Sequence, residues 1–136
     1  MDLSDVRTEV EAAHERAREA FGARDVEGTM AGFSRRLRYR QLDGRWTGWV
    51  DLRRDVQRQF ASLRASGSRY EIEGFTQTGT AEVTETLSQT AWAEVVAFLF
   101  LRRRWTIRRR ARYVWTLEED GQWRISEVQI LEETVR

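Results

Sequence analysis

The 136-residue chain is long enough for one domain with a sizeable core, and its 40% hydrophobic and 33% charged residues are typical of a globular protein. Its formal net charge is +1, every Lys/Arg position is an arginine, and it has no cysteine. These counts exclude disulfides, thiolate nucleophiles and lysine Schiff bases, and one histidine cannot build a two- or three-histidine metal site. We therefore expect neither a metal nor a cofactor.

Two stretches of the sequence bear on where the protein resides. Residues 1–10 are polar and acidic, unlike a secretory signal peptide. Residues 95–101 form the longest apolar run, which is far shorter than the roughly 20 residues that cross a bilayer. We therefore expect a cytoplasmic protein with no membrane partner.

The first half of the chain predicts three helices. Apolar residues recur at spacings of three and four from Val6 to Phe21, and we expect this helix to begin at Ser4 and to end at Gly22. Asp25 is a suitable N-cap for a short second helix, and residues 50–65 predict a third one that ends before Gly67. Between the second and third helices, residues 37–41 alternate like a strand, and residues 43–44 indicate a hairpin turn.

The second half of the chain predicts strands joined by short turns. Residues 70–77 and 81–92 flank one turn, and residues 106–118 and 122–131 flank another. This order predicts an α+β fold in which three helices cover the concave face of a cone-shaped, curved antiparallel sheet.

Two motifs resemble a known family. The run Tyr113–Ile125 (YVWTLEEDGQWRI) resembles a hairpin near the C-terminus of SnoaL-like and uncharacterised members of the nuclear transport factor 2-like superfamily. Residues 21–33 are similar to the turn between the first two helices of those proteins. The same superfamily includes ketosteroid isomerase and scytalone dehydratase. The resemblance implies one pocketed domain over residues 1–136, and dimerisation through the convex sheet face.

The resemblance does not extend to a known catalytic set. Ketosteroid isomerase carries its aspartate base just after the second helix, where this chain has Ser34, Arg35 and Arg36. The paired histidine and aspartate that SnoaL-like cyclases place in the sheet are also missing. The resemblance therefore identifies a fold and leaves the reaction open.

The last hairpin predicts which side chains meet inside the cone. A three-residue loop, residues 119–121, pairs Trp115 with Ile125, Tyr113 with Glu127, and Ala111 with Gln129. This register predicts an apolar floor that leads to a polar cluster, which is typical of a small-molecule site.

The predicted site follows from that cluster. Glu127 is the candidate catalytic acid or base, because a desolvated carboxylate has a raised pKa that suits proton transfer. The candidate ligand-binding residues are Tyr113, Gln129, Trp115, Tyr39 and Trp49. Alternatively, Glu127 is only hydrogen-bonded to Tyr113 or lies at a solvated rim. His14 lies beside Glu11 and Glu15, which predicts a solvated or half-buried side chain.

Seven arginines fall between Arg102 and Arg112, interleaved with Trp105 and Ile107. Arginines among aromatic residues are typical of nucleic-acid binding. The net charge of +1 argues against it and favours ion pairs on an exposed sheet face. The carboxylates available for such pairs are Glu71, Glu73, Glu82 and Glu85.

The apolar tip at Phe98–Leu101 would be a liability in water, so we expect it to cover the pocket mouth or to contact a second subunit. Alternatively, residues 90–103 form a short helix. Val114, Val128 and Ile130 fall on the outer face of the last hairpin in the predicted register, which favours a homodimer through the convex face.

These observations favour a homodimeric pocket protein that binds a small apolar ligand, with acid/base chemistry of the isomerase, dehydratase or cyclase kind. The alternative is a protein-interaction or assembly module without catalysis. Nucleic-acid binding through Arg102–Arg112 is the least favoured function.

Overall fold

The computed structural model describes residues 2–98 and 101–136, with the side chains of residues 96–98, 101 and 102 left out of the description. Its elements, in chain order, are α1 (Leu3–Gly22), α2 (Val26–Met30), β1 (Phe33–Arg40), β2 (Trp46–Thr47), α3 (Trp49–Ser62), β3 (Leu63–Gly79), β4 (Glu82–Phe98), β5 (Leu101–Leu117) and β6 (Trp123–Val135). None of the helices in these ranges is long and apolar enough to cross a membrane.

The helices form where local signals predict them. The Asp2 side chain accepts a hydrogen bond from the Ser4 N–H at 2.9 Å, so α1 begins one residue before the predicted cap. Asp25 caps α2, as predicted, by accepting from the Gly28 N–H at 3.1 Å. The third helix is shorter than predicted and ends at Ser62, because Leu63 pairs with Val95 in the sheet.

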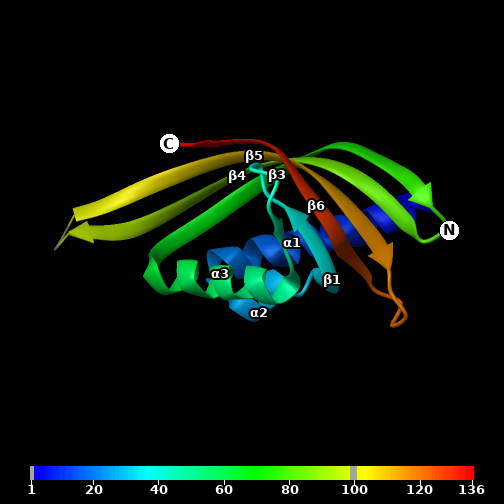
Figure 1. The fold of residues 1–136 in the computed structure, drawn as a ribbon, viewed down its shortest axis with the longest axis horizontal. Helices are drawn as coiled ribbons and strands as arrows, with labels where there is room; N and C mark the ends of the chain where they lie inside the picture. Colours follow the sequence, from blue (N-terminus) through cyan, green and yellow to red (C-terminus); the bar gives the residue numbers. More distant parts are fainter. Residues whose placement is uncertain (1, 99–100) are drawn as a thin grey trace.

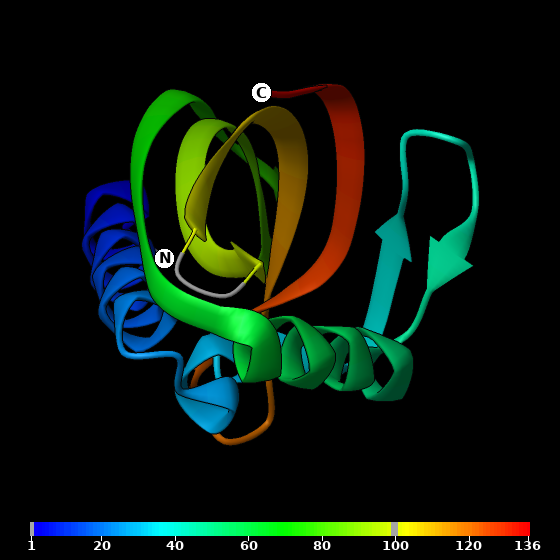
Figure 2. The same cartoon turned by 90° about the vertical axis from the view of Figure 1, so that its left-hand side faces the viewer.

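The sheet has six strands in the order β2-β1-β6-β5-β4-β3. Every neighbouring pair is antiparallel except β1 and β6, which are parallel, so the sheet is mixed rather than purely antiparallel as predicted. The long strands arch over the three helices, which lie together on the concave side (Figure 1). A second view shows β3 to β6 curling into the wall of a cone above α2 and α3 (Figure 2). The α+β cone predicted from the sequence is confirmed.

The strands are longer than predicted. β3, β4 and β5 each have 17 residues, and β4 pairs with β5 as far as Phe98 and Leu101. The alternative helix over residues 90–103 is therefore wrong. Both predictions for the Phe98–Leu101 tip, that it covers the pocket mouth or that it contacts a second subunit, fall on side chains outside the described residues.

A β-bulge in β6 changes which side chains point into the cone. The predicted pair Trp115–Ile125 is confirmed, and Gly121 takes the positive φ of +79° that the loop requires. The register then shifts between Val114 and Trp115. Because one residue of slip moves a side chain to the other face, every predicted pair beyond this point is wrong.

The bulge has a simple physical cause in the apolar pattern of β6. Val128 and Ile130 turn inward and are almost completely buried in the core, with 0% and 4% exposure. Tyr113 consequently pairs with Val128, whereas Glu127 and Gln129 lie on the convex face. The apolar convex patch predicted from Val114, Val128 and Ile130 is therefore absent, since two of its three residues belong to the core.

Candidate functional site

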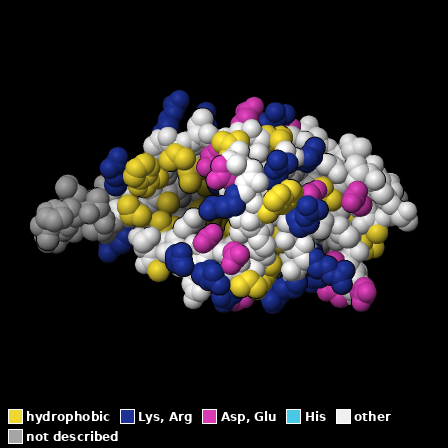
Figure 3. Space-filling model, in the orientation of Figure 1, with side chains coloured by type: hydrophobic (Ala, Val, Ile, Leu, Met, Phe, Trp, Pro, Cys, Tyr) yellow, Lys and Arg dark blue, Asp and Glu magenta, His cyan; other side chains and the backbone are white. Residues whose placement is uncertain are grey.

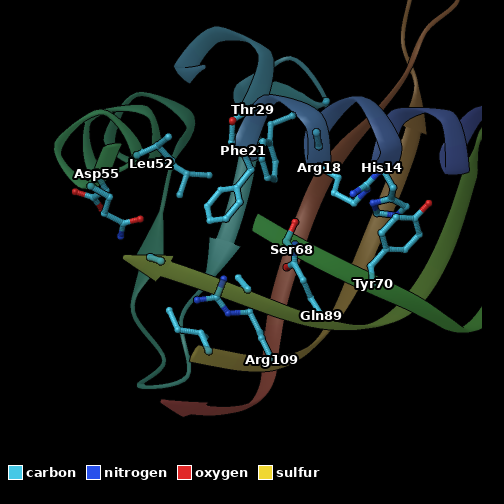
Figure 4. A pocket seen from close by; sticks show the side chains of 18 of the residues that line it. His14, Arg18, Phe21, Thr29, Leu52, Asp55, Ser68, Tyr70, Gln89 and Arg109 are labelled. Atoms are coloured by element: carbon cyan, nitrogen blue, oxygen red, sulfur yellow. The ribbon is translucent and has the colours of Figure 1, made fainter. Parts of the chain in front are cut away.

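A cavity of about 460 Å³ lies between the concave sheet face and the helices. Side chains from α1, α2, α3, β1, β3, β4, β5 and β6 line it, as Figure 4 shows for part of the set. Near the outer ends of β4 and β5, hydrophobic side chains gather around a hollow in the surface (Figure 3). The cavity-lining residues in this part of the sheet include Ala93, Trp105 and Ile107. The site is therefore a largely apolar cleft that extends towards the outer ends of β4 and β5.

Alternating residues of β5 line this cleft from its closed end to its open end. The inward-facing side chains are Trp115, Tyr113, Arg109, Ile107 and Trp105, which line the cavity, and Ala111, which belongs to the buried core. Trp115 is buried at the closed end, with 1% exposure, and Trp105 is partly exposed. Successive inward positions are about 7 Å apart along a strand. The strand therefore places two polar positions, Tyr113 and Arg109, at different depths in an apolar cavity.

A buried histidine–carboxylate pair closes the deep end. His14 on α1 has its Nε2 at 2.8 and 3.0 Å from the two carboxylate oxygens of Glu85 on β4. Trp115 also donates its Nε1–H to Glu85 at 3.0 Å. Glu85 is fully buried and His14 is 8% exposed. The predictions of a solvated or half-buried His14 and of Glu85 on an exposed face are therefore both wrong.

The geometry fixes the orientation of the imidazole. An ionised carboxylate only accepts hydrogen bonds, so His14 donates its Nε2–H to Glu85 when Glu85 carries its charge. Within the described part of the chain, no side chain or backbone group is hydrogen-bonded to Nδ1 of His14. When the imidazole is neutral, Nδ1 carries the lone pair and can accept a proton. The pair can therefore act as an oriented acid or base.

Aromatic rings surround His14. Tyr70 and Tyr113 lie tilted against it, with ring centroids 4.9 and 6.0 Å away, and Trp115 meets it edge-on at 5.3 Å. His14, Tyr70, Tyr113 and Trp115 all line the cavity. These rings bury most of the imidazole beside the cavity.

Two tyrosines and an arginine form a second polar group. Burial raises the pKa of the Tyr113 and Tyr39 hydroxyls above the ordinary value of 10.0, so both remain protonated at neutral pH. Arg109 Nη1 donates to the Tyr39 hydroxyl at 3.4 Å, and Arg109 Nε donates to Glu133 at 2.8 Å. These residues supply hydrogen-bond donors to the cavity.

The structure brings together three of the predicted site residues and separates the rest. Tyr113, Trp115 and Tyr39 line the cavity. Trp49 lies outside it, with the Arg35 guanidinium 3.6 Å from its ring centroid. Glu127 is 4.0 Å from Arg38 on the convex face, and Gln129 there accepts a hydrogen bond from Arg112. The bulge thus removes both residues from the predicted cluster.

The arginine cluster divides between the two sheet faces. Arg110 pairs with Glu73 on the convex face at 2.7 Å, as the ion-pair prediction requires, whereas Arg109 points into the cavity. Arg103 and Arg104 lie over the rings of Trp105 and Trp92. The cluster therefore does not form one basic stripe. Among the described residues, no group of three or more His, Asp or Glu side chains could hold a metal ion.

Comparison with known proteins supports the fold. No protein-family model matches the chain, and no curated protein matches its sequence. Among solved structures, a scytalone dehydratase-like protein from Novosphingobium aromaticivorans has a TM-score of 0.78 at 13% identity, over 97% of this chain and 87% of that one. A nuclear transport factor 2-like superfamily protein from Salmonella enterica gives 0.73 at 14% identity, over 96% and 92%. A ketosteroid isomerase-like protein from Erwinia carotovora gives 0.67 at 15% identity, over 92% and 95%. The chain therefore has the nuclear transport factor 2-like cone fold.

Proposed function

We propose that this protein binds a small, largely apolar molecule in the cone and that His14, oriented by Glu85, exchanges a proton with it. The observation that carries the proposal is the His14–Glu85 hydrogen bond of 2.8 Å, made by a fully buried carboxylate at the end of an apolar cavity. A carboxylate with no access to water is costly to bury, so its place beside a cavity indicates chemistry rather than stability alone.

The cavity suits such a ligand. Its walls are apolar and aromatic over most of their area and also carry polar groups, among them the charged side chains of Arg18, Asp55 and Arg109. Thr29, which also lines it, has a buried hydroxyl with no hydrogen-bond partner among the described residues. The Tyr113 hydroxyl keeps its proton and can donate to an oxygen of the ligand. A ligand oxygen near these groups would satisfy hydrogen-bonding capacity that the protein leaves unused.

The reaction class follows from one oriented imidazole and a nearby hydroxyl donor. His14 would take a proton from a carbon or oxygen of the ligand, while Tyr113 stabilises the oxygen on which negative charge develops. Isomerisation, dehydration and cyclisation all need these two actions. Two of the similar structures are named after a dehydratase and an isomerase. Their low identity lends fold-level support only, so the chemistry rests on His14 and Glu85.

We also propose that the protein is a homodimer through the convex face, on the strength of the superfamily resemblance. The apolar patch predicted on the convex face of the last hairpin is absent. The neighbouring strand β4 presents Thr84, Thr86 and Ser88 on that face. The contact would therefore be polar rather than hydrophobic.

Binding can be tested with the neutral dye N-phenyl-1-naphthylamine, whose fluorescence rises in apolar sites. Wild type should bind the dye, and Ala91→Phe, which fills the cavity, should not. Thr90→Phe is the matched control, because Thr90 neighbours Ala91 on β4 and points to the other face. Dye binding that survives Ala91→Phe as well as Thr90→Phe would overturn the proposed site.

Proton transfer can be tested with 4-nitrophenol, whose anion is yellow. In weakly acidic buffer, wild type should raise the yellow fraction of the bound phenol, because His14 accepts its proton. His14→Gln should abolish the colour while the phenol still binds, and Glu85→Gln should weaken it. Unchanged colour in His14→Gln would show that His14 is not the base.

A further inference from the structure

A polar row crosses the inner face of the sheet, two inward positions away from Tyr113. Tyr70 pairs with Gln89, Gln89 pairs with Arg109, and Arg109 pairs with Glu133, so one row spans β3 to β6. The first three of these side chains line the cavity. The neighbouring row towards the closed end is Ile72, Leu87, Ala111 and Ile130. The neighbouring row towards the open end is Ser68, Ala91, Ile107 and Val135, so the polar row has mainly apolar neighbours on both sides.

Arg109 is the only cation of the polar row and reaches from β5 into the cavity (Figure 4). Its Nε is bonded to Glu133 at 2.8 Å and its Nη1 to the Tyr39 hydroxyl at 3.4 Å. Guanidinium has five N–H donors, and no hydrogen bond occupies Nη2 within the described part of the chain. Burial alone would lower the pKa of Arg109. The interactions with Tyr39 and Glu133 raise this pKa by more than burial lowers it, so the pKa is raised overall and the guanidinium stays cationic. Unused charged donors therefore face the cavity.

The neighbours of Arg109 suit a negatively charged oxygen. The Gln89 amide lies beside it in the row and makes no hydrogen bond to another described residue. Among the described residues, Glu133 is the one carboxylate bonded to Arg109. It accepts its hydrogen bond from Nε of Arg109 and does not line the cavity. The planar guanidinium can donate two parallel N–H bonds to a carboxylate, and these charge-assisted hydrogen bonds are stronger than those to a neutral group. They are stronger still where water is scarce, as inside a cavity.

We infer that the ligand is an amphipathic acid: an apolar body that carries a carboxylate, which Arg109 binds with help from Gln89. This inference rests on the proposed function, since it assigns the polar end of the same ligand. The carboxylate lies in the middle of the cavity, and the apolar body extends towards His14 and Tyr113, where the proton is exchanged. Arg109 and the His14–Glu85 pair thus hold two different parts of one molecule.

The test compares 4-phenylbutyrate with its uncharged amide, 4-phenylbutyramide, by isothermal titration calorimetry at neutral pH. Wild type should bind the acid about tenfold or more tightly than the amide, the usual effect of a charge-assisted hydrogen bond in a sheltered site. Arg109→Gln should reduce the preference to within about twofold by weakening acid binding only. Arg110→Gln, on the opposite face of β5 and paired with Glu73, should leave both affinities unchanged.

A second variant keeps the arginine in place. Glu133→Gln removes the competing carboxylate while Arg109 stays cationic, so acid binding should tighten severalfold and amide binding should not. Circular dichroism melting identifies any variant that fails to fold. Equal affinity of wild type for both probes, or a preference that survives Arg109→Gln, would overturn the inference and leave the proposed pocket standing. If neither probe nor the neutral dye binds wild type, the proposed function fails and the inference fails with it.

Discussion

Replacing Glu85 with alanine should cost more stability than any other single change to the site. The Glu85 carboxylate is fully buried and accepts hydrogen bonds from His14 at 2.8 and 3.0 Å and from Trp115 at 3.0 Å. In Glu85→Ala, two buried N–H donors lose their acceptor, at about 1–3 kcal/mol each, and the missing carboxylate leaves a void. We expect a loss of about 3–6 kcal/mol, a large share of the 5–15 kcal/mol typical of a small domain.

The measurement is urea unfolding followed by tryptophan fluorescence, with the free energy of unfolding extrapolated to water. Glu85→Gln should lose less, because the amide keeps the volume and one acceptor oxygen. Glu73→Ala is the control: Glu73 is paired with Arg110 on the exposed convex face, where ion pairs contribute little. If Glu85→Ala costs no more than Glu73→Ala, the buried network does not stabilise the fold and the reasoning fails.

Three further predictions concern the tyrosines, a glycine in β3 and the oligomeric state. The pKa values of all three tyrosines are raised, that of Tyr70 to about 12 chiefly by desolvation, so ultraviolet absorbance at pH 10 should show little tyrosinate. The stability that the protonated tyrosines contribute is complete below pH 10 and is lost as the pH rises through their pKa values in the folded protein. Tyrosines that are half ionised in the folded protein at pH 10 would contradict this prediction. Gly67→Ala places a methyl 2.6 Å from the Trp92 ring, so it should lower the melting temperature, whereas Gly32→Ala, with open space, should not. Native mass spectrometry should find a species of about twice 16.1 kDa, and a monomer alone would refute the homodimer.

Local signals were enough to predict the elements and the fold class. The Asp25 cap, the Asp43-Gly44 turn and the three-residue loop ending at Gly121 all form where the sequence indicates. These features depend on residues within a few positions of one another. The ends of the long strands depend on distant partners: residues 63–65 continue the helical pattern of α3, yet Leu63 and Ala65 pair with β4, 29 or more positions along the chain.

The site was harder to predict because it depends on register and on burial. The spacing of the last hairpin is correct as far as Trp115, but no local signal marks the bulge after it. The burial of Val128 and Ile130 decides the register, and burial is a property of the whole core. The sequence therefore predicts the wrong face for Glu127, although it predicts the right strand.

The His14–Glu85 pair did leave a signal in the sequence. Val83, Glu85 and Leu87 alternate with Thr84 and Thr86, which places a carboxylate between two buried apolar residues near the start of β4. His14 lies at helical spacing from Val10 and Ala17, so it belongs to the same stripe of α1. Both residues break an apolar pattern, yet their separation of 71 positions hides that they meet.

The presence of His14 and Glu85 in otherwise apolar patterns is better explained by function than by stability. A hydrophobic pair of similar volume would fill the space between α1 and β4 without desolvating a carboxylate, and such replacements are often neutral or stabilising. The fold therefore gains no stability from an ionisable pair at this point that leucines could not supply. What leucines could not supply is a proton acceptor held in one orientation beside a cavity. Departures from the apolar pattern are expected at functional sites, and here the two departures converge on one hydrogen bond at the end of the pocket.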